Sequence, residues 1–171
     1  MKAALWLLLV LSLIAVQAQM PPPPAVNSPL LDRLAGTWVL RGTLGNQSTI
    51  HDVQAEWVVQ HHYLRVHEVS REKGADGQPL YEALVFLTWN RQAKQYYCDW
   101  LDNFGGALEP ELGFADAGEN RISLIFQKRK GEIDFENDLI YDPASDAWEW
   151  RLDNISGGTH QPFARLHLTR K

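Results

Sequence analysis

Cysteine is nearly absent from this chain, and its scarcity limits how the fold can be held together. Cys98 is the single cysteine among 171 residues, so no intrachain disulfide can form. Stability must therefore come from buried apolar surface and hydrogen bonds. Cys98 alternates with aromatic neighbours, and we expect it to pack as a small apolar residue.

Long apolar runs are also scarce. The one such run covers residues 3–16 and is shorter than the roughly 20 residues that a membrane-spanning helix needs. Lys2 precedes it, and Val16-Gln17-Ala18 places small or medium side chains where a signal peptidase reads them. We predict that residues 1–18 are a signal peptide and that the protein is exported, to the periplasm or outside the cell, without stable membrane insertion. A retained membrane anchor is the alternative.

The motifs that mark common enzyme classes are missing. No serine lies in a Gly-x-Ser-x-Gly turn, and the sequence contains no Gly-rich phosphate loop, paired-cysteine metal motif or nucleotide-binding fingerprint. We therefore predict no catalytic residue and no metal site. The net charge of −5 argues against nucleic acid or an anionic membrane surface as a partner.

Consecutive prolines occur in one place, at residues 21–24. Such a run favours an extended polyproline II segment that cannot donate hydrogen bonds to a sheet. We interpret residues 19–29 as a linker and residues 30–171 as the folded domain. Residues 30–34 are expected to form one short helical turn that closes the bottom of the fold.

From Gly36 onward, apolar and polar residues alternate, and turn-forming residues interrupt the alternation at short intervals. In residues 147–155, for example, Trp148, Trp150 and Leu152 share one face. The pattern predicts ten strands, at residues 37–44, 49–59, 62–71, 80–89, 95–102, 106–114, 121–129, 132–141, 147–155 and 162–169.

The order of these strands follows from the lack of helices between them. No stretch after Gly36 has the apolar stripe of a crossover helix, so the strands must form an antiparallel meander. Closure of the meander removes its two exposed edges. We predict an all-β fold, a single antiparallel up-and-down barrel of about ten strands. An open sheet or sandwich is the alternative.

Three short motifs resemble a known group of barrels. Leu34-Ala35-Gly36-Thr37-Trp38 contains the Gly-x-Trp signature of the lipocalin and fatty-acid-binding superfamily. Tyr63-Leu64-Arg65 and Trp100-Leu101-Asp102, followed by Gly105-Gly106, extend the pattern. Together they resemble a bacterial exported lipocalin-like (calycin-type) β-barrel family of unknown function. The resemblance covers nearly the whole folded domain and implies the same closed barrel.

Gly36 and Trp38 are expected to have structural roles. Glycine lets the entering chain bend tightly beneath the barrel, and Trp38 should point inward and plug the closed end. In lipocalins a basic residue from the last strand packs over this tryptophan. The resemblance therefore implies that Arg165 or Arg170 covers Trp38 through a cation–π contact, and we select Arg165 as the structural residue.

Several polar residues fall on strand faces that should point into the barrel. Asp102 shares a face with Trp100. Asn154 shares one with Trp150, and Asn137 lies on an otherwise apolar face. A buried polar group without a partner costs roughly 1–3 kcal/mol. Two interpretations stay open: an apolar ligand cavity with a few polar anchors, or an internal polar network bridged by water.

The ligand interpretation gives the functional prediction. We predict an exported binding protein that holds a small hydrophobic or amphipathic molecule in its barrel. The alternatives are a barrel enzyme, such as an isomerase or a haem-dependent detoxifying enzyme, and a filled barrel with a structural or interaction role. Arg65 is expected to enter the cavity as the counter-charge of Asp102 or of a ligand carboxylate. The predicted ligand-binding residues are Arg65, Trp100, Asp102, Asn137 and Trp150.

The histidines do not suggest a shared metal site. His61 and His67 share a face of one predicted strand but lie about 20 Å apart along it, so they cannot bind one metal ion. We expect them, together with His51 and His62, to decorate partly exposed strands.

Haem is the one cofactor alternative. The nitrobindin type of haem barrel also has ten strands and supplies an axial histidine near its last strand. His160 and His167 lie near the corresponding element here, but their spacing differs, and the opening run of residues 36–42 lacks one of that family's glycines. No cofactor is therefore predicted.

Overall fold

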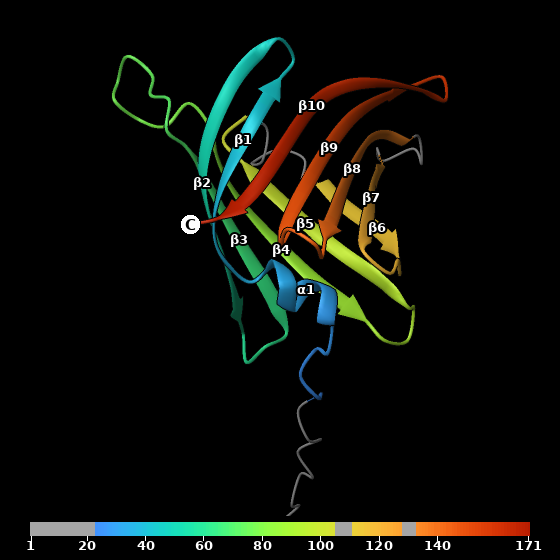
Figure 1. Ribbon diagram of the computed structural model, residues 1–171. Coiled ribbons are helices and arrows are strands. Elements are labelled where there is room, and N and C mark those ends of the chain that lie inside the picture. Colours follow the sequence, from blue (N-terminus) through green and yellow to red (C-terminus); the bar gives the residue numbers. More distant parts are fainter. Residues whose placement is uncertain (1–22, 105–110, 128–132) are drawn as a thin grey trace, which may run out of the picture.

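The computed structural model describes residues 23–104, 111–127 and 133–171. Within these ranges, ten strands form a closed antiparallel barrel with one short helix at its end (Figure 1). Neighbours in sequence are neighbours in the sheet, and β1 pairs with β10 to close the ring. The predicted up-and-down barrel is confirmed, and the sandwich alternative is wrong. The elements are α1 (Pro29–Leu34), β1 (Gly36–Leu44), β2 (Gln47–Val58), β3 (Tyr63–Ser70), β4 (Glu82–Asn90), β5 (Gln95–Asp102), β6 (Glu111–Asp116), β7 (Arg121–Gln127), β8 (Ile133–Asp142), β9 (Ala147–Ser156) and β10 (Thr159–Arg170).

The strand β6 ends two residues later than its predicted range of 106–114. It extends to Asp116, which pairs with Gln95 of β5. Its inward residues are Gly113 and Ala115, and side chains this small leave no apolar alternation to detect. The remaining predicted strand residues, 106–110, 128–129 and 132, lie outside the described residues.

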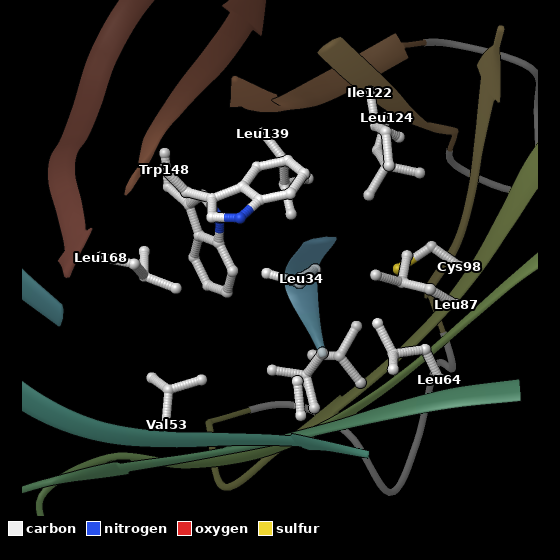
Figure 2. Packing of buried hydrophobic residues seen from close by; sticks show 14 of the residues in the cluster. Leu34, Val53, Leu64, Leu87, Cys98, Ile122, Leu124, Leu139, Trp148 and Leu168 are labelled. Carbon is white, nitrogen blue, oxygen red and sulfur yellow. The ribbon is translucent and has the colours of Figure 1, made fainter. Parts of the chain in front are cut away.

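Inward-facing side chains fill the half of the barrel next to α1. Figure 2 shows them gathered around Leu34 of the helix, with Trp148 on one side and Leu64 on the other. Cys98 is buried in this cluster, as predicted, and burial raises the pKa of its thiol well above the usual value. Each large aliphatic side chain buried here contributes about 1.5–3 kcal/mol to stability.

The helix α1 plugs this end of the barrel. It starts after Ser28, whose Oγ accepts a hydrogen bond from the Leu31 N–H at 3.3 Å, and Pro29 occupies its first turn. Ser28 Oγ also lies 3.2 Å from the Tyr96 hydroxyl of β5, which ties the cap to the barrel wall. Among the described residues, no helix has the length and apolar character needed to cross a membrane.

Trp38 is completely buried at the plugged end, as predicted. Its Nε1 donates a hydrogen bond to the Leu34 carbonyl at 2.7 Å, and the guanidinium carbon of Arg170 lies 3.9 Å from the centroid of its ring. Gly36 has a φ of 140°, and a Cβ at this position would collide with the Arg170 guanidinium. The close approach of Arg170 to the backbone therefore requires glycine here.

Arg165 does not cover Trp38, contrary to our selection. Leu166 and Leu168 are the buried residues of this part of β10, so Arg165 lies on the outer face and Arg170 continues the inward row. On the outer face, Arg165 forms an ion pair with Asp153 at 2.6 Å.

Candidate ligand-binding site

A cavity of about 430 Å³ occupies the half of the barrel away from α1. The strand β1 starts beside α1, and its last residue, Leu44, lines the cavity. The cavity therefore lies toward the end where the β1–β2 and β9–β10 hairpins turn (Figure 1). Small-molecule sites commonly have volumes of about 300–1,000 Å³. The lining residues are Leu44, His51, Glu68, Tyr81, Trp100, Asp102, Phe104, Phe126, Phe135, Trp150, Leu152, Asn154, Phe163 and Leu166.

Aromatic rings form a continuous wall on one side of the cavity. Trp100 of β5 packs edge to face against Trp150 of β9 and Phe126 of β7, with ring centroids 6.4 Å apart in each pair. Phe135 lies 6.0 Å from Phe126 and 6.2 Å from Phe163. Such T-shaped contacts hold each ring in one orientation, so the wall is preformed.

A buried histidine and a buried carboxyl group lie on the opposite side. His51 of β2 and Glu68 of β3 are 1% and 3% exposed. The Nδ1 of His51 is hydrogen-bonded to Oε1 of Glu68, and its Nε2 lies 2.7 Å from the Thr49 hydroxyl. Both ring nitrogens are therefore engaged, and neither is open to act on a ligand as a base.

Tyr81 connects this pair to Asp102. Its ring stacks on that of His51, with centroids 5.5 Å apart, and its hydroxyl accepts a hydrogen bond from Trp100 Nε1 at 3.1 Å. The same hydroxyl makes a long hydrogen bond of 3.5 Å to Oδ2 of Asp102. Burial, together with the negative charges of Glu68 and Asp102, raises the pKa of Tyr81 well above its usual value. The hydroxyl therefore stays protonated.

The two carboxyl groups stand on one row of the sheet. Glu68 pairs with Ala83 of β4, and Ala83 pairs with Asp102 of β5. The Cα atoms of Glu68 and Asp102 are thus two strand spacings apart, roughly 10 Å. Ala83 between them carries only a methyl side chain and is buried. We call Glu68, Tyr81 and Asp102 the acidic corner.

The structure brings three of the five predicted ligand-binding residues to the cavity. Trp100, Asp102 and Trp150 all line it. Arg65 does not: it lies on the outer face of β3, where it is ion-paired with Glu56. Leu64 and Val66 are the buried neighbours of Arg65, so strict alternation turns the arginine away from the lumen, and its predicted role is wrong.

Asn137 is completely buried but is not among the residues that line the cavity. Its Oδ1 and Nδ2 have no hydrogen-bond partner among the described residues, and the same holds for the indole N–H of Trp150. Asn137 pairs with Leu152 of β9, one of the lining residues. It faces the barrel interior between Phe135, which lines the cavity, and Leu139 of the packed core.

Sequence reasoning missed His51, Glu68, Tyr81 and the phenylalanine Phe163. For Glu68 a signal existed, because it alternates in register with the apolar residues of β3. His51 likewise shares the buried face of β2, so the expectation that it decorates an exposed strand is wrong. Phe163 could not be found by alternation, because a register shift between residues 162 and 164 interrupts β10.

The other histidines lie apart from one another. His61 stacks on Trp57 with ring centroids 3.9 Å apart, and His67 is hydrogen-bonded to Glu82 at 2.7 Å. Within the described ranges, no group of three or more His, Cys, Asp or Glu side chains is arranged to hold a metal ion.

The two histidines considered for haem do not reach the cavity. His160 lies in the β9–β10 hairpin region, 3.3 Å from a carboxylate oxygen of Glu136, and is about half exposed. His167 is exposed on the outer face of β10. Neither belongs to the lining of the cavity, so neither is placed to ligate a haem inside it.

The closed ten-stranded antiparallel barrel is consistent with a calycin-like fold. No family model matches the chain, and a search of curated proteins finds no significant match. The function is therefore inferred from the cavity and its side chains.

Proposed function

We propose that this protein is an exported, lipocalin-like binding protein that holds one small hydrophobic or amphipathic molecule in the barrel cavity. The observation that supports binding is the cavity itself, in which seven of the fourteen lining residues carry Phe, Tyr or Trp rings. The motifs at Gly36, Tyr63 and Trp100 support the relation to bacterial exported lipocalin-like barrels.

The composition of the lining favours a guest that is apolar over most of its surface. Removing apolar surface from water contributes about 25 cal/mol per Å², and the aromatic wall offers such surface in a fixed arrangement. Apart from Asn154 on β9, the polar groups lie together at and beside the acidic corner, so they would orient a guest with one polar end. This distribution is typical of small-molecule sites.

Isothermal titration calorimetry with 4-phenylbutanol, a compact neutral amphipath, tests the proposal. We expect saturable binding of one molecule, and we expect Trp100→Leu to weaken it roughly tenfold because the variant removes the central ring of the wall. Trp89→Leu is the matched control, since Trp89 packs against Tyr96 and does not line the cavity.

Two results would contradict the proposal. One is the absence of binding by the wild-type protein, both for 4-phenylbutanol and for a panel of neutral alcohols of similar size. The other is equal weakening by the two tryptophan variants, which would place the bound molecule outside the cavity.

Export is tested separately, by fractionating bacterial cells that express the full chain. We expect the protein in the periplasm or medium, with Gln19 as its first residue. Ala18→Asp should block this processing, since signal peptidase needs a small residue before the cleavage site. Recovery of the unprocessed wild-type chain from the cytoplasm would contradict export.

A further inference from the structure

A buried amide without hydrogen bonds lies in the apolar interior of the β8–β9 wall. Asn137 is completely buried, and neither its Oδ1 nor its Nδ2 has a hydrogen-bond partner among the described residues. The indole N–H of Trp150, on the neighbouring strand, likewise lacks a partner within the described ranges. Buried polar groups are nearly always hydrogen-bonded, because an unsatisfied one destabilises the folded state. Two such groups on adjacent strands therefore favour a partner from outside the chain.

The strand register places both groups at the floor of the cavity. Along β8, Asn137 follows Phe135, which lines the cavity, and precedes the packed core. Its direct neighbour on β9 is Leu152, another lining residue, and Trp150 lies on the diagonal, about 7–8 Å away between Cα atoms. Trp150 is the deepest lining residue of β9, since Trp148, the next inward residue toward α1, belongs to the core (Figure 2). Both groups therefore lie where the cavity ends and the packed core begins.

The unpartnered atoms offer donors as well as an acceptor. The side chain of Asn137 carries an NH₂ group and a carbonyl oxygen, and Trp150 adds a second N–H. A carboxamide or a lactam presents the same two functions, so it can pair with asparagine through two hydrogen bonds. This match holds whichever way the Asn137 amide is turned, since exchanging its oxygen and nitrogen leaves one donor group and one acceptor. An ionised carboxylate would be costlier to bury there, because no Lys or Arg occurs among the described residues that line the cavity.

We propose that the floor of the cavity binds a neutral amide group of the ligand, a carboxamide or lactam attached to an apolar or aromatic body. This inference rests on the binding function proposed above and specifies its ligand class. The ligand amide pairs with Asn137, and its carbonyl oxygen also accepts from the Trp150 indole, after Leu152 has changed rotamer to uncover the floor. The body lies against Trp100 and Phe126 of the aromatic wall. The strand β8 stands five strands from β3 in either direction around the ring, so this contact is separate from the acidic corner.

Two ligands of nearly the same shape test the inference by isothermal titration calorimetry. 4-Phenylbutanamide carries both a donor and an acceptor, whereas 5-phenyl-2-pentanone has a methyl group in place of the amide nitrogen and can only accept. We expect the amide to bind the wild-type protein roughly tenfold more tightly than the ketone, because only the amide satisfies both functions of Asn137. 4-Phenylbutanol, which tests the binding function itself, is measured alongside.

The variant Asn137→Leu removes the buried amide and keeps a branched side chain in its place. We expect it to bring the affinities for the amide and the ketone to within about twofold of each other. Asn154→Leu is the matched control, because it makes the same substitution on the same face of the neighbouring strand, at an exposed lining residue nearer the β9–β10 hairpin. It should leave the preference for the amide intact.

A nuclear magnetic resonance measurement on the wild-type protein needs no variant. The indole N–H resonance of Trp150 should move downfield when 4-phenylbutanamide binds, because this N–H then gains an acceptor. The indole N–H of Trp148 is the internal control. It also has no partner in the described part of the chain, but it lies in the packed core beside Tyr141, so its resonance should stay in place.

The outcomes separate this inference from the proposed function. If the amide, the ketone and the alcohol bind the wild-type protein equally well, the binding function stands and the amide site is overturned. If Asn137→Leu keeps the preference, or Asn154→Leu loses it, the ligand amide lies elsewhere and the inference fails. If none of the three ligands binds, the proposed function fails together with the inference. Should Asn137→Leu not fold, the Trp150 resonance decides: a downfield shift confined to it supports the inference, and an unmoved resonance in the amide complex overturns it.

Discussion

Removing the Arg170 side chain should destabilise the barrel more than removing any other arginine on β10. Its guanidinium covers Trp38, a contact worth about 1 kcal/mol. It also donates to the carbonyls of Ala35 at 2.9 Å and Arg33 at 3.1 Å, each worth about 0.5–1 kcal/mol for a half-exposed group. The ion pair with Asp146 adds at most about 1 kcal/mol. We expect Arg170→Met to lower the free energy of unfolding by about 2–3 kcal/mol.

Urea unfolding followed by tryptophan fluorescence measures this change. The free energy of unfolding typically falls by about 1–3 kcal/mol per molar urea, so the midpoint should fall by about 0.7–3 M. Arg170→Lys should show an intermediate loss, because an ammonium keeps the charge but cannot reach both carbonyls with a planar fork. Arg165→Met is the control, since Arg165 forms its ion pair on the outer face, and we expect it to cost less than about 1 kcal/mol.

A midpoint that falls equally in Arg170→Met and Arg165→Met would refute this reasoning. The plugged end would then be held by the packing of α1 and Trp38 alone, without a contribution from the guanidinium.

Three further changes have directions fixed by the structure. Asn137→Leu should raise the thermal unfolding temperature, because it removes a completely buried amide without partners that costs about 1–3 kcal/mol; a lower temperature would mean that the amide is satisfied by water or a ligand. Gly36→Ala should destabilise the protein in urea by more than about 1 kcal/mol, since φ is 140° and the new Cβ meets Arg170. The pKa of Asp52 is lowered from 3.8 to about 2, chiefly by its hydrogen bond from Arg71. Its contribution to the free energy of unfolding is therefore complete above pH 3.8 and is lost as the pH falls through about 2. Asp52→Asn should remove this loss, so stability should depend less on pH between about 3.8 and 2.

The sequence contained enough information to predict the barrel. Alternation identified ten strands, and the lack of a crossover helix left only an antiparallel order, which the pairing of β1 with β10 completes. The end of β6 was predicted two residues too early because Gly113 and Ala115 carry too little apolar surface to mark their face. Closure itself could be argued only from the cost of exposed edges, since no local signal in β1 or β10 specifies their pairing.

The candidate site was only half predictable, for a different reason. Trp100, Asp102 and Trp150 were found because each alternates with apolar residues on its own strand. Glu68 follows the same alternation but was not selected as a site residue. Arg65 was selected for its charge, although the alternation places it on the outer face. The contact between Glu68 and His51 joins neighbouring strands, and that between His51 and Tyr81 reaches a residue just before β4. Such contacts depend on register, which one sequence does not specify.

The buried pair of His51 and Glu68 is better explained by binding than by stability. Moving both groups out of water costs about as much as their attraction returns, so replacing such a pair by apolar residues is commonly neutral or stabilising by about 1–4 kcal/mol. Leu64 and Val66 occupy the same face of β3, which shows that the interior there accepts aliphatic side chains. We therefore expect the double variant His51→Leu/Glu68→Leu to be at least as stable as the wild type in urea and to bind 4-phenylbutanol more weakly. Lower stability with an unchanged affinity for 4-phenylbutanol would show instead that the pair serves the fold.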